Sequence, residues 1–235
     1  LYEGEPIQAV FHSSGGGYTE AASAVWGKDI PYLQAVPDYD QDSPKFSWNR
    51  VFTKVQLTRL LSQGGYELGD LQGIRLSART APPMRWTPDR GTSGRVKRMT
   101  FVGSKKSITL TGSQVRSLLD LDSALFDIRI GLERPKELDV TITNGYGYPI
   151  GKKTIPISGD KKSGTEGASV GDMRLFTNVD GEKVIFTGNG FGHGVGLSQW
   201  GARGMALQKN KRGKHNDYKT ILSHYYQGIT VKQVY

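Results

Sequence analysis

The chain has 235 residues, which at roughly 150 residues per domain is enough for one large domain or two lobes. Hydrophobic residues make up 36% and charged residues 23% of the sequence, a balance typical of a globular protein and not of a disordered chain. The absence of cysteine excludes disulfide bonds, thiolate zinc sites and cysteine nucleophiles. No apolar run approaches the about 20 residues of a membrane-spanning helix, so we expect no transmembrane segment in this sequence.

The net charge of +9 is unevenly distributed along the chain. Residues 1–50 carry a net charge of −4, whereas residues 51–100 and 201–235 each carry +6. Two basic regions fit a surface that faces a polyanion, such as nucleic acid, an anionic cell-wall polymer or a membrane surface. Ordinary solvated lysine and arginine side chains would explain the same charge, so the charge alone does not select a function.

The first residues, Leu1-Tyr2-Glu3-Gly4-Glu5, contain no initiator methionine and no signal-like segment. An apolar strand is expected over residues 7–11, as the second strand of a hairpin whose first strand would lie upstream, so we expect this chain to be a fragment of a longer precursor. Thr19 favours a short helical turn over residues 19–22. Further strands are expected over residues 31–36 and 48–53.

The middle of the chain predicts a compact lobe. Thr53 is a candidate cap for a helix over residues 54–62, whose leucines at i, i+3 and i+4 lie on one face. The elements that follow are a strand over 74–79, a hairpin of 94–102 with 107–111, a helix from 111 to 119 and a strand over 125–130. Residues 49–130 therefore predict an inserted α+β lobe.

The remainder of the chain predicts a mobile loop over residues 151–172, because this segment is rich in Gly, Lys and Ser. Strands over 173–177 and 184–187 flank a turn at Val179-Asp180-Gly181. Helices over 198–208 and 217–226 and a strand over 230–234 complete the chain. The predicted fold class is α+β, with two lobes of mixed sheets and short helices and a cleft between them. Residues 1–48 with 131–235 form the lobe that bears the motifs.

The densest motif is the Gly-rich block of residues 188–201, which surrounds a single histidine, His193. Glycine lets the backbone approach a ligand closely, and Ser198 can cap the following helix, whose free N–H groups favour anions or polarised oxygens. His193 could be a general acid or base, a ligand donor to sugar hydroxyls, or a residue that holds the Gly-rich turn through hydrogen bonds.

A second histidine, His12, lies at a predicted strand end beside Ser13, Ser14 and three glycines. Adjacent residues of a strand point to opposite faces, so His12 cannot easily activate Ser13 as a nucleophile. Metal binding by His12 would need partners that the sequence does not supply as thiolates.

Four segments together resemble the SpoIID/LytB family, in the same order and over nearly the whole chain. They are Ala9-Val10-Phe11-His12-Ser13-Ser14-Gly15-Gly16, Ser93-Gly94-Arg95-Val96, residues 192–202, which begin Gly192-His193-Gly194-Val195-Gly196, and Ile221-Leu222-Ser223-His224-Tyr225-Tyr226-Gln227-Gly228. The Gly-His-Gly block is the most specific of them.

The resemblance implies cell-wall chemistry outside the cytoplasm, in the periplasm, in the cell wall or as a secreted protein. The SpoIID branch consists of lytic transglycosylases that act on peptidoglycan glycan strands free of stem peptides. The LytB branch implies the alternative, a non-catalytic glycan-binding module or an enhancer of a cell-wall amidase. Peptidoglycan glycan strands are thus the predicted partner and an amidase a second candidate.

The family's catalytic acid is a Glu on a helix before the His-Ser-Ser block, and this sequence contains no counterpart. We therefore expect the fragment alone to be inactive. Zinc-binding members use cysteines near the equivalent of His12, where this chain has Tyr18, so no metal and no cofactor are predicted.

The candidate catalytic residues are His193 and Glu20, although Glu20 is expected to be a hydrogen-bonding residue more than a substitute acid. The candidate substrate-binding residues lie in the same two blocks: His12, Ser13, Ser14, Gly192, Gly194, Ser198, Gln199 and Trp200. We expect His12 and His193 to lie close together in one cleft. Nucleic-acid binding, suggested only by the pI of about 9.6, lacks a recognised motif and is not predicted.

Overall fold

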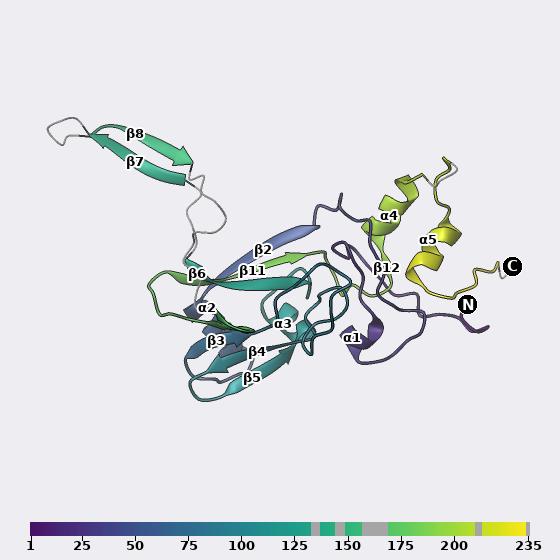
Figure 1. The fold of residues 1–235 in the computed structure, drawn as a ribbon, viewed down its shortest axis with the longest axis horizontal. Coiled ribbons are helices and arrows are strands. Elements are labelled where there is room, and N and C mark those ends of the chain that lie inside the picture. The colour runs from purple at the N-terminus through teal and green to yellow at the C-terminus, as the bar shows by residue number, and fades with distance from the viewer. Residues whose placement is uncertain (133–136, 144–148, 157–168, 210–212, 234–235) are drawn as a thin grey trace.

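A computed structural model describes residues 1–132, 137–143, 149–156, 169–209 and 213–233 (Figure 1). Short helices and several small sheets make up this part of the chain, so the predicted α+β class is confirmed. Its helices are α1 (Ala22–Trp26), α2 (Lys54–Gln63), α3 (Gly112–Leu118), α4 (Gln199–Leu207) and α5 (Tyr218–Tyr225). Within the described ranges, every helix is too short or too polar to cross a bilayer.

Two antiparallel sheets form the centre of the molecule. The three-stranded sheet has β11 (Glu182–Asn189) between β2 (Ser47–Thr53) and β6 (Phe126–Leu132). The five-stranded sheet has the order β5 (Ser107–Thr111), β4 (Arg98–Gly103), β3 (Leu71–Arg75), β10 (Met173–Leu175) and β9 (Ser169–Val170). Both edges of β11 are occupied, so the predicted turn at residues 179–181 joins strands of two different sheets.

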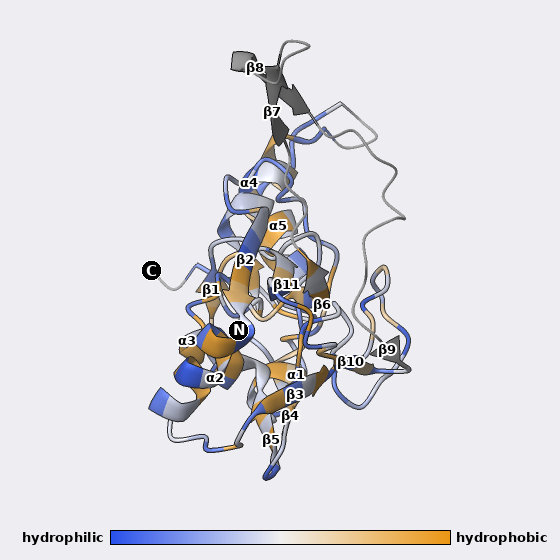
Figure 2. Ribbon diagram, turned by 90° about the vertical axis from the view of Figure 1, so that its left-hand side faces the viewer, coloured by the Kyte–Doolittle hydropathy of each residue, from blue (hydrophilic) through white to orange (hydrophobic). Residues whose placement is uncertain are grey.

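The larger hydrophobic core lies between these sheets and helices α2 and α3. Both helices begin with a capping box, in which Thr53 pairs with Gln56 and Thr111 with Gln114, and the predicted Thr53 cap is confirmed. In Figure 2 the hydrophobic colour is concentrated on the strands and on parts of these helices. The most buried members of this core are Leu57, Leu61, Leu71, Ile74, Leu76, Phe101, Val115, Phe126, Val184 and Phe186.

A second, smaller core joins α1 to α4 and α5 through Ala22, Ile30, Leu33, Val36, Val195, Met205, Tyr225 and Tyr226. Phe176, Val184 and Phe186, by contrast, pack in the first core. The segment around β10 and β11 therefore shares its core with the predicted inserted lobe, although we had grouped it with the lobe that bears the motifs. The division of the chain into these two lobes stays a prediction.

Three expected strands differ from the structure. Within residues 7–11 only Phe11 belongs to a strand, β1 (Phe11–His12), which pairs in parallel with β12 (Leu197–Ser198). The strand predicted over residues 31–36 is wrong, because this segment forms a loop whose apolar side chains enter the second core. The strand predicted at residues 230–234 is also wrong over 230–233, where Thr230 instead exchanges backbone hydrogen bonds with Leu1.

The strands β7 (Glu137–Thr143) and β8 (Pro149–Pro156) form an antiparallel pair that projects away from the rest of the molecule (Figure 1). The mobile loop predicted over residues 151–172 is therefore wrong at its start, where β8 continues to residue 156. Residues 157–168 of that prediction lie outside the described residues.

Candidate functional site

The two Gly-rich motifs meet in space. The imidazole rings of His12 and His193 lie 5.4 Å apart between centroids, so their predicted proximity is confirmed. The short parallel pairing of β1 with β12 produces this contact, and mutual backbone hydrogen bonds of Ser14 with Phe191 extend it. Residues separated by most of the chain therefore form one local structure.

Both ring nitrogens of His193 are engaged by the backbone. Nε2 lies 3.0 Å from the carbonyl oxygen of Phe11, and Nδ1 accepts a hydrogen bond of 3.1 Å from the N–H of Val195. A neutral ring with its proton on Nε2 satisfies both contacts. Burial lowers the pKa of His193, the hydrogen bond to Phe11 opposes this, and the charges of Arg95 and Arg116 lower it further. This geometry favours a positioning role for His193.

His12 differs from His193 because one of its ring nitrogens is unpartnered. Its Nδ1 lies 3.2 Å from the carbonyl oxygen of Val195, whereas Nε2 is buried without a hydrogen-bond partner. Burial lowers the pKa of His12 well below its ordinary value, and the charge of Arg95 adds to this effect. His12 is therefore a neutral ring at pH 7.

Two buried carboxylates hold the loop that follows His12. Asp38 accepts the N–H of Gly15 at 3.0 Å, and Asp40 accepts those of Gly16 and Gly17 at 2.7 and 2.8 Å. The hydroxyl of Ser14 also donates to Asp40. Burial and the neighbouring Asp40 raise the pKa of Asp38. Ser14 therefore stabilises the loop through a bond to a carboxylate.

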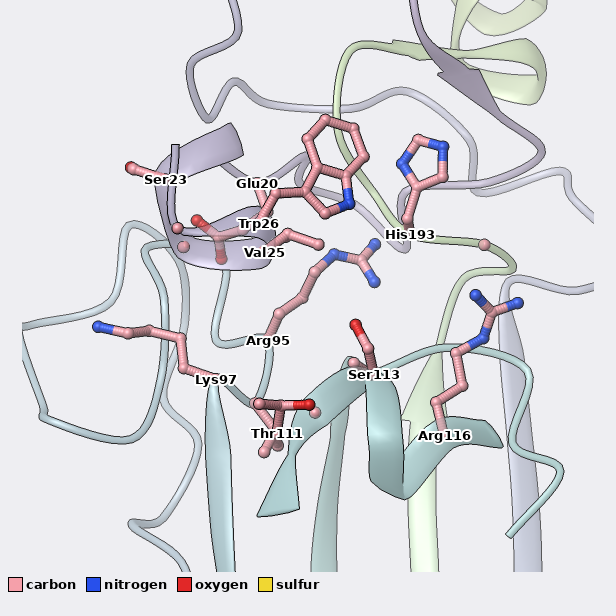
Figure 3. Close-up of a pocket in the computed structure, with 16 residues that line it drawn as sticks. Glu20, Ser23, Val25, Trp26, Arg95, Lys97, Thr111, Ser113, Arg116 and His193 are labelled. Atoms are coloured by element: carbon pink, nitrogen blue, oxygen red, sulfur yellow. The ribbon is translucent and has the colours of Figure 1, made fainter. Parts of the chain in front are cut away.

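A pocket of about 370 Å³ opens beside His193. Trp26, at the end of α1 and 45% exposed, forms one wall with His193, and their rings lie 5.3 Å apart (Figure 3). Arg95 lies in the middle of the view, with Ser113 and Arg116 of α3 below it. The pocket is thus built from α1, from the loop before β4, from α3 and from the Gly-rich loop of His193.

Glu20 lines this pocket, but its carboxylate is fully engaged by the protein. Its side chain is 1% exposed and accepts hydrogen bonds from the backbone of Ala21, Thr92 and Ser93 at 3.0 to 3.1 Å and from the Ser93 hydroxyl at 2.7 Å. These bonds connect the start of α1 to the loop that carries Arg95. The geometry favours the structural role that the sequence indicated for Glu20.

Arg95 is the most buried cation of the pocket. Its Nη2 donates a hydrogen bond of 2.6 Å to the carbonyl of Gly15, while Nε and Nη1 are buried without partners. Burial lowers its pKa to about 10. The guanidinium lies against the backbone of Gly194, where a Cβ atom would overlap it, and Gly194 has a φ of +83°. Glycine is required there for both reasons.

Of the other predicted site residues, some line the pocket and others hold the neighbouring segments in place. Gly192 lines the pocket. Ser198 accepts the N–H of Gly201 at 3.1 Å and caps α4, and the carbonyl of Ser13 accepts the N–H of Trp200. Gln199 and Trp200, at the start of α4, are not among the residues that line this pocket. Their predicted contact with a substrate stays a prediction.

Sequence reasoning missed most of the pocket lining, including Trp26, Lys97, Ser113 and Arg116. The helix that carries Arg116 was predicted over residues 111–119, but nothing in the sequence placed this helix beside His193. Among the described residues no group of three or more His, Asp or Glu side chains is placed to hold a metal ion.

Comparisons with known proteins agree with these motifs. A family described as a domain of unknown function (DUF8618) matches residues 32–151, just over half of the chain. The chain belongs to the DUF8618 family. This DUF8618 chain is 28% identical to the amidase enhancer of Bacillus subtilis over 239 residues, covering 98% of the chain and 30% of that protein.

Stage II sporulation protein D of Bacillus subtilis is also 28% identical to the DUF8618 chain, over 99% of the chain and 47% of that protein. An uncharacterized protein of Brachyspira hyodysenteriae is 52% identical over 98% of the chain and 45% of its own length. The DUF8618 chain thus spans less than half the length of these curated relatives. The names of the two Bacillus proteins confirm the resemblance to the SpoIID/LytB family.

Proposed function

We propose that the pocket between Trp26 and His193 binds peptidoglycan glycan strands, in a SpoIID-like cell-wall protein located outside the cytoplasm. The proposal rests on the composition of the pocket, in which the exposed indole of Trp26 lies beside polar side chains. An aromatic face stacks on the apolar face of a sugar ring, and the hydroxyl of Ser113 can hydrogen-bond to its substituents. The names of the relatives support a cell-wall protein of the SpoIID family.

We propose further that the reaction of the whole protein is lytic transglycosylation. Such cleavage needs a carboxylic acid that protonates the leaving oxygen and then accepts a proton from a sugar hydroxyl. Glu20 does not fit this role, because both of its oxygens already accept hydrogen bonds from the protein. The resemblance implies an acid on a helix before His12, so the proposal assigns catalysis to a protein that contains that helix.

A second candidate function is a glycan-binding module that enhances an amidase. The observation in its favour is that the pocket of the described chain contains no free carboxylate. One relative is named an amidase enhancer. In this alternative the pocket binds the strand and a partner enzyme performs the chemistry.

The test uses glycan strands with and without stem peptides. We expect the chain from Leu1 to Tyr235 to bind strands without peptides and to leave them intact, while a longer form with the preceding helix releases products with 1,6-anhydro ends, detected by mass spectrometry. The Trp26→Ala variant should weaken binding severalfold. The control Tyr218→Ala, at an exposed aromatic residue outside the pocket, should bind normally.

Each outcome has a clear meaning. Binding without cleavage by the longer form would favour the amidase-enhancer alternative. Robust cleavage by the short chain would place the acid within these residues and would contradict the structural assignment of Glu20. Absence of binding by every form would overturn the glycan proposal itself.

A further inference from the structure

A second pocket, of about 330 Å³, lies between α1 and the loop that precedes β4. Its lining comes from residues at the start of α1 and from residues 84–92 of the loop, and it includes neither His193 nor a residue of α3. The exposed Trp86 forms part of its wall. We call this space the Trp86 pocket and the one described above the His193 pocket.

The two pockets are contiguous. Four residues line both of them: Glu20, Ser23, Ala24 and Lys97. In Figure 3, Ser23 and Lys97 lie on the opposite side of the view from His193, so the Trp86 pocket extends the His193 pocket in that direction. The side chains that α1 contributes to both pockets, those of Ser23 and Ala24, are small. They form a low boundary that an extended polymer can cross.

Trp86 makes the Trp86 pocket similar in kind to its neighbour. It is 79% exposed, as Trp26 is exposed at the wall of the His193 pocket. An indole that stays in water can bury its face when a sugar ring stacks on it. Thr92 is also exposed in the Trp86 pocket and supplies a hydroxyl for hydrogen bonds to a sugar. Each pocket therefore combines an exposed indole with polar groups.

The loop that carries Trp86 is firmly anchored, although the indole itself is exposed. The buried Arg90 donates hydrogen bonds of 2.7 to 2.9 Å to three carbonyls, those of Ser77, Gly94 and Phe126. Its remaining amino group forms an ion pair of 3.2 Å with Asp127. Arg90 is thus occupied by the protein and holds the loop in place. A ring presented from an anchored loop loses little conformational freedom when it binds a ligand.

We propose that the Trp86 pocket is a second sugar subsite, with Trp86 as its stacking face, so that a glycan strand crosses α1 from one indole to the other. This proposal rests on the proposed function and specifies its substrate as an oligosaccharide long enough to fill both pockets. Volumes of about 370 and 330 Å³ are each near the lower end of the range of ligand sites, about 300–1,000 Å³. Neither pocket alone accommodates a strand of several sugars. Binding in one pocket holds the strand at a high effective concentration beside the other.

The experiment measures how affinity depends on strand length. The probes are peptidoglycan glycan fragments of two, four and six sugars, each titrated calorimetrically into the chain. We expect the longest fragment to bind at least about tenfold more tightly than the shortest, because only a long fragment engages both pockets. We call this quotient of affinities the length ratio.

Variants of Trp86 connect the length ratio to the second subsite. Trp86→Ala should lower the ratio to about two- to threefold, while the affinity for the two-sugar fragment changes by less than about twofold. Trp86→Phe keeps an aromatic face and should retain part of the ratio. The control is Tyr218→Ala, which removes an exposed aromatic ring outside both pockets and should leave the ratio unchanged. Thermal unfolding of each variant shows whether the fold is preserved.

A substitution at the boundary tests whether one strand occupies both pockets. Ser23→Leu places a larger side chain where the pockets meet and should lower the length ratio as Trp86→Ala does. Ser23→Ala removes the same hydroxyl without adding bulk and is the matched control, so the ratio should be preserved in it. Equal ratios in these two variants would contradict a strand that crosses α1.

The outcomes separate this proposal from the proposed function. Equal binding of all three fragments by the unmodified chain would overturn the second subsite and leave glycan binding by the His193 pocket intact. A length ratio that persists in a folded Trp86→Ala variant would also overturn it, as would a ratio that Tyr218→Ala lowers as fully. Binding of none of the fragments would overturn both this proposal and the proposed function.

Discussion

The hydroxyl of Tyr225 donates a hydrogen bond of 2.7 Å to a carboxylate oxygen of Asp38, 187 positions earlier in the chain. The other oxygen of Asp38 accepts the N–H of Gly15. Helix α5 is therefore tied through one buried carboxylate to the loop that follows His12. The C-terminal helix in this way supports the geometry of the histidine pair without lining the pocket.

We expect Tyr225→Phe to lower the free energy of unfolding by about 1.5–3 kcal/mol, since it removes a buried hydrogen bond to a charged group. The neighbouring Tyr226 offers a matched control, because its hydroxyl donates to the neutral carbonyl of Val10 at 2.8 Å. Tyr226→Phe should cost about 0.5–1.5 kcal/mol. Urea unfolding measures both variants. An equal loss of unfolding free energy in the two would show that the hydrogen bond to Asp38 stabilises the fold no more than the one to the neutral carbonyl.

Gly194→Ala should destabilise the protein far more than Gly4→Ala. Both glycines have a positive φ, +83° and +90°, so alanine costs about 1 kcal/mol of backbone strain at either position. Only at position 194 does the new Cβ overlap the Arg95 guanidinium, whereas nothing lies within 4 Å at position 4. Thermal unfolding compares the two variants. Similar melting temperatures would contradict the tight packing of Arg95 on this backbone.

The Glu20→Gln variant separates a structural carboxylate from a catalytic one. The amide nitrogen cannot accept the hydrogen bonds that Glu20 receives, so we expect a loss of about 1–3 kcal/mol in stability. Glu182 is the control, because it is also nearly buried and accepts the backbone N–H groups of Thr177 and Asn178 outside the pocket. Glu182→Gln should lose comparable stability. In the longer form that includes the preceding helix, loss of glycan turnover per folded molecule in Glu20→Gln but not in Glu182→Gln would assign chemistry to Glu20.

Stability should fall on acidification below about pH 7. The folded-state pKa values of His12 and His193 lie below the ordinary value of 6.5, so near pH 6 the unfolded chain binds protons that the folded chain does not. The free energy of unfolding therefore rises with pH up to about pH 7.5 and is then constant, with a slope of at most about 1.4 kcal/mol per pH unit for each histidine.

The measurement is urea unfolding between pH 5.5 and 8, compared with His12→Asn. Asparagine can still donate to the carbonyl of Val195 but does not titrate, so this variant should show a shallower slope. The exposed His215, replaced by glutamine, serves as the control and should preserve the slope of the unmodified protein. An unchanged slope in His12→Asn would show that His12 is not the residue that couples folding to pH.

Elements with local signals were predictable from the sequence. Thr53 with Gln56 marks the start of α2, and the apolar spacing of Val115, Leu118 and Leu119 marks α3, since capping and helical periodicity act within a few residues. The segment 31–36 has the composition of a strand, but its carbonyls accept single hydrogen bonds from the backbone of Thr19 and Ala22 and it joins no sheet. Its apolar side chains are buried by α4 and α5 instead, and this depends on the arrangement of the whole chain.

The residues of the candidate site were also only partly predictable from the sequence. His12 and His193 could be paired from their motifs, because glycine-rich blocks of high specificity mark both. Trp26 and Arg116 could not, because an exposed indole and a helical arginine become a pocket only when α1 and α3 meet. Trp48 shows the opposite case. Although its ring is an indole like that of Trp26, it is buried and packs on Phe126 in the larger core.

The parallel pairing of β1 with β12 has a consequence for the order in which the protein folds. It joins Phe11 to Leu197 and His12 to Ser198, so a very long loop must close before these few contacts form. Contacts of such sequence separation form late, after the hairpins and capped helices of the larger core. Protection of the amide of Leu197 in pulsed hydrogen exchange should therefore appear after that of β4 and β5. The pocket beside His193, to which we assign glycan binding, would then exist only in molecules that have completed folding.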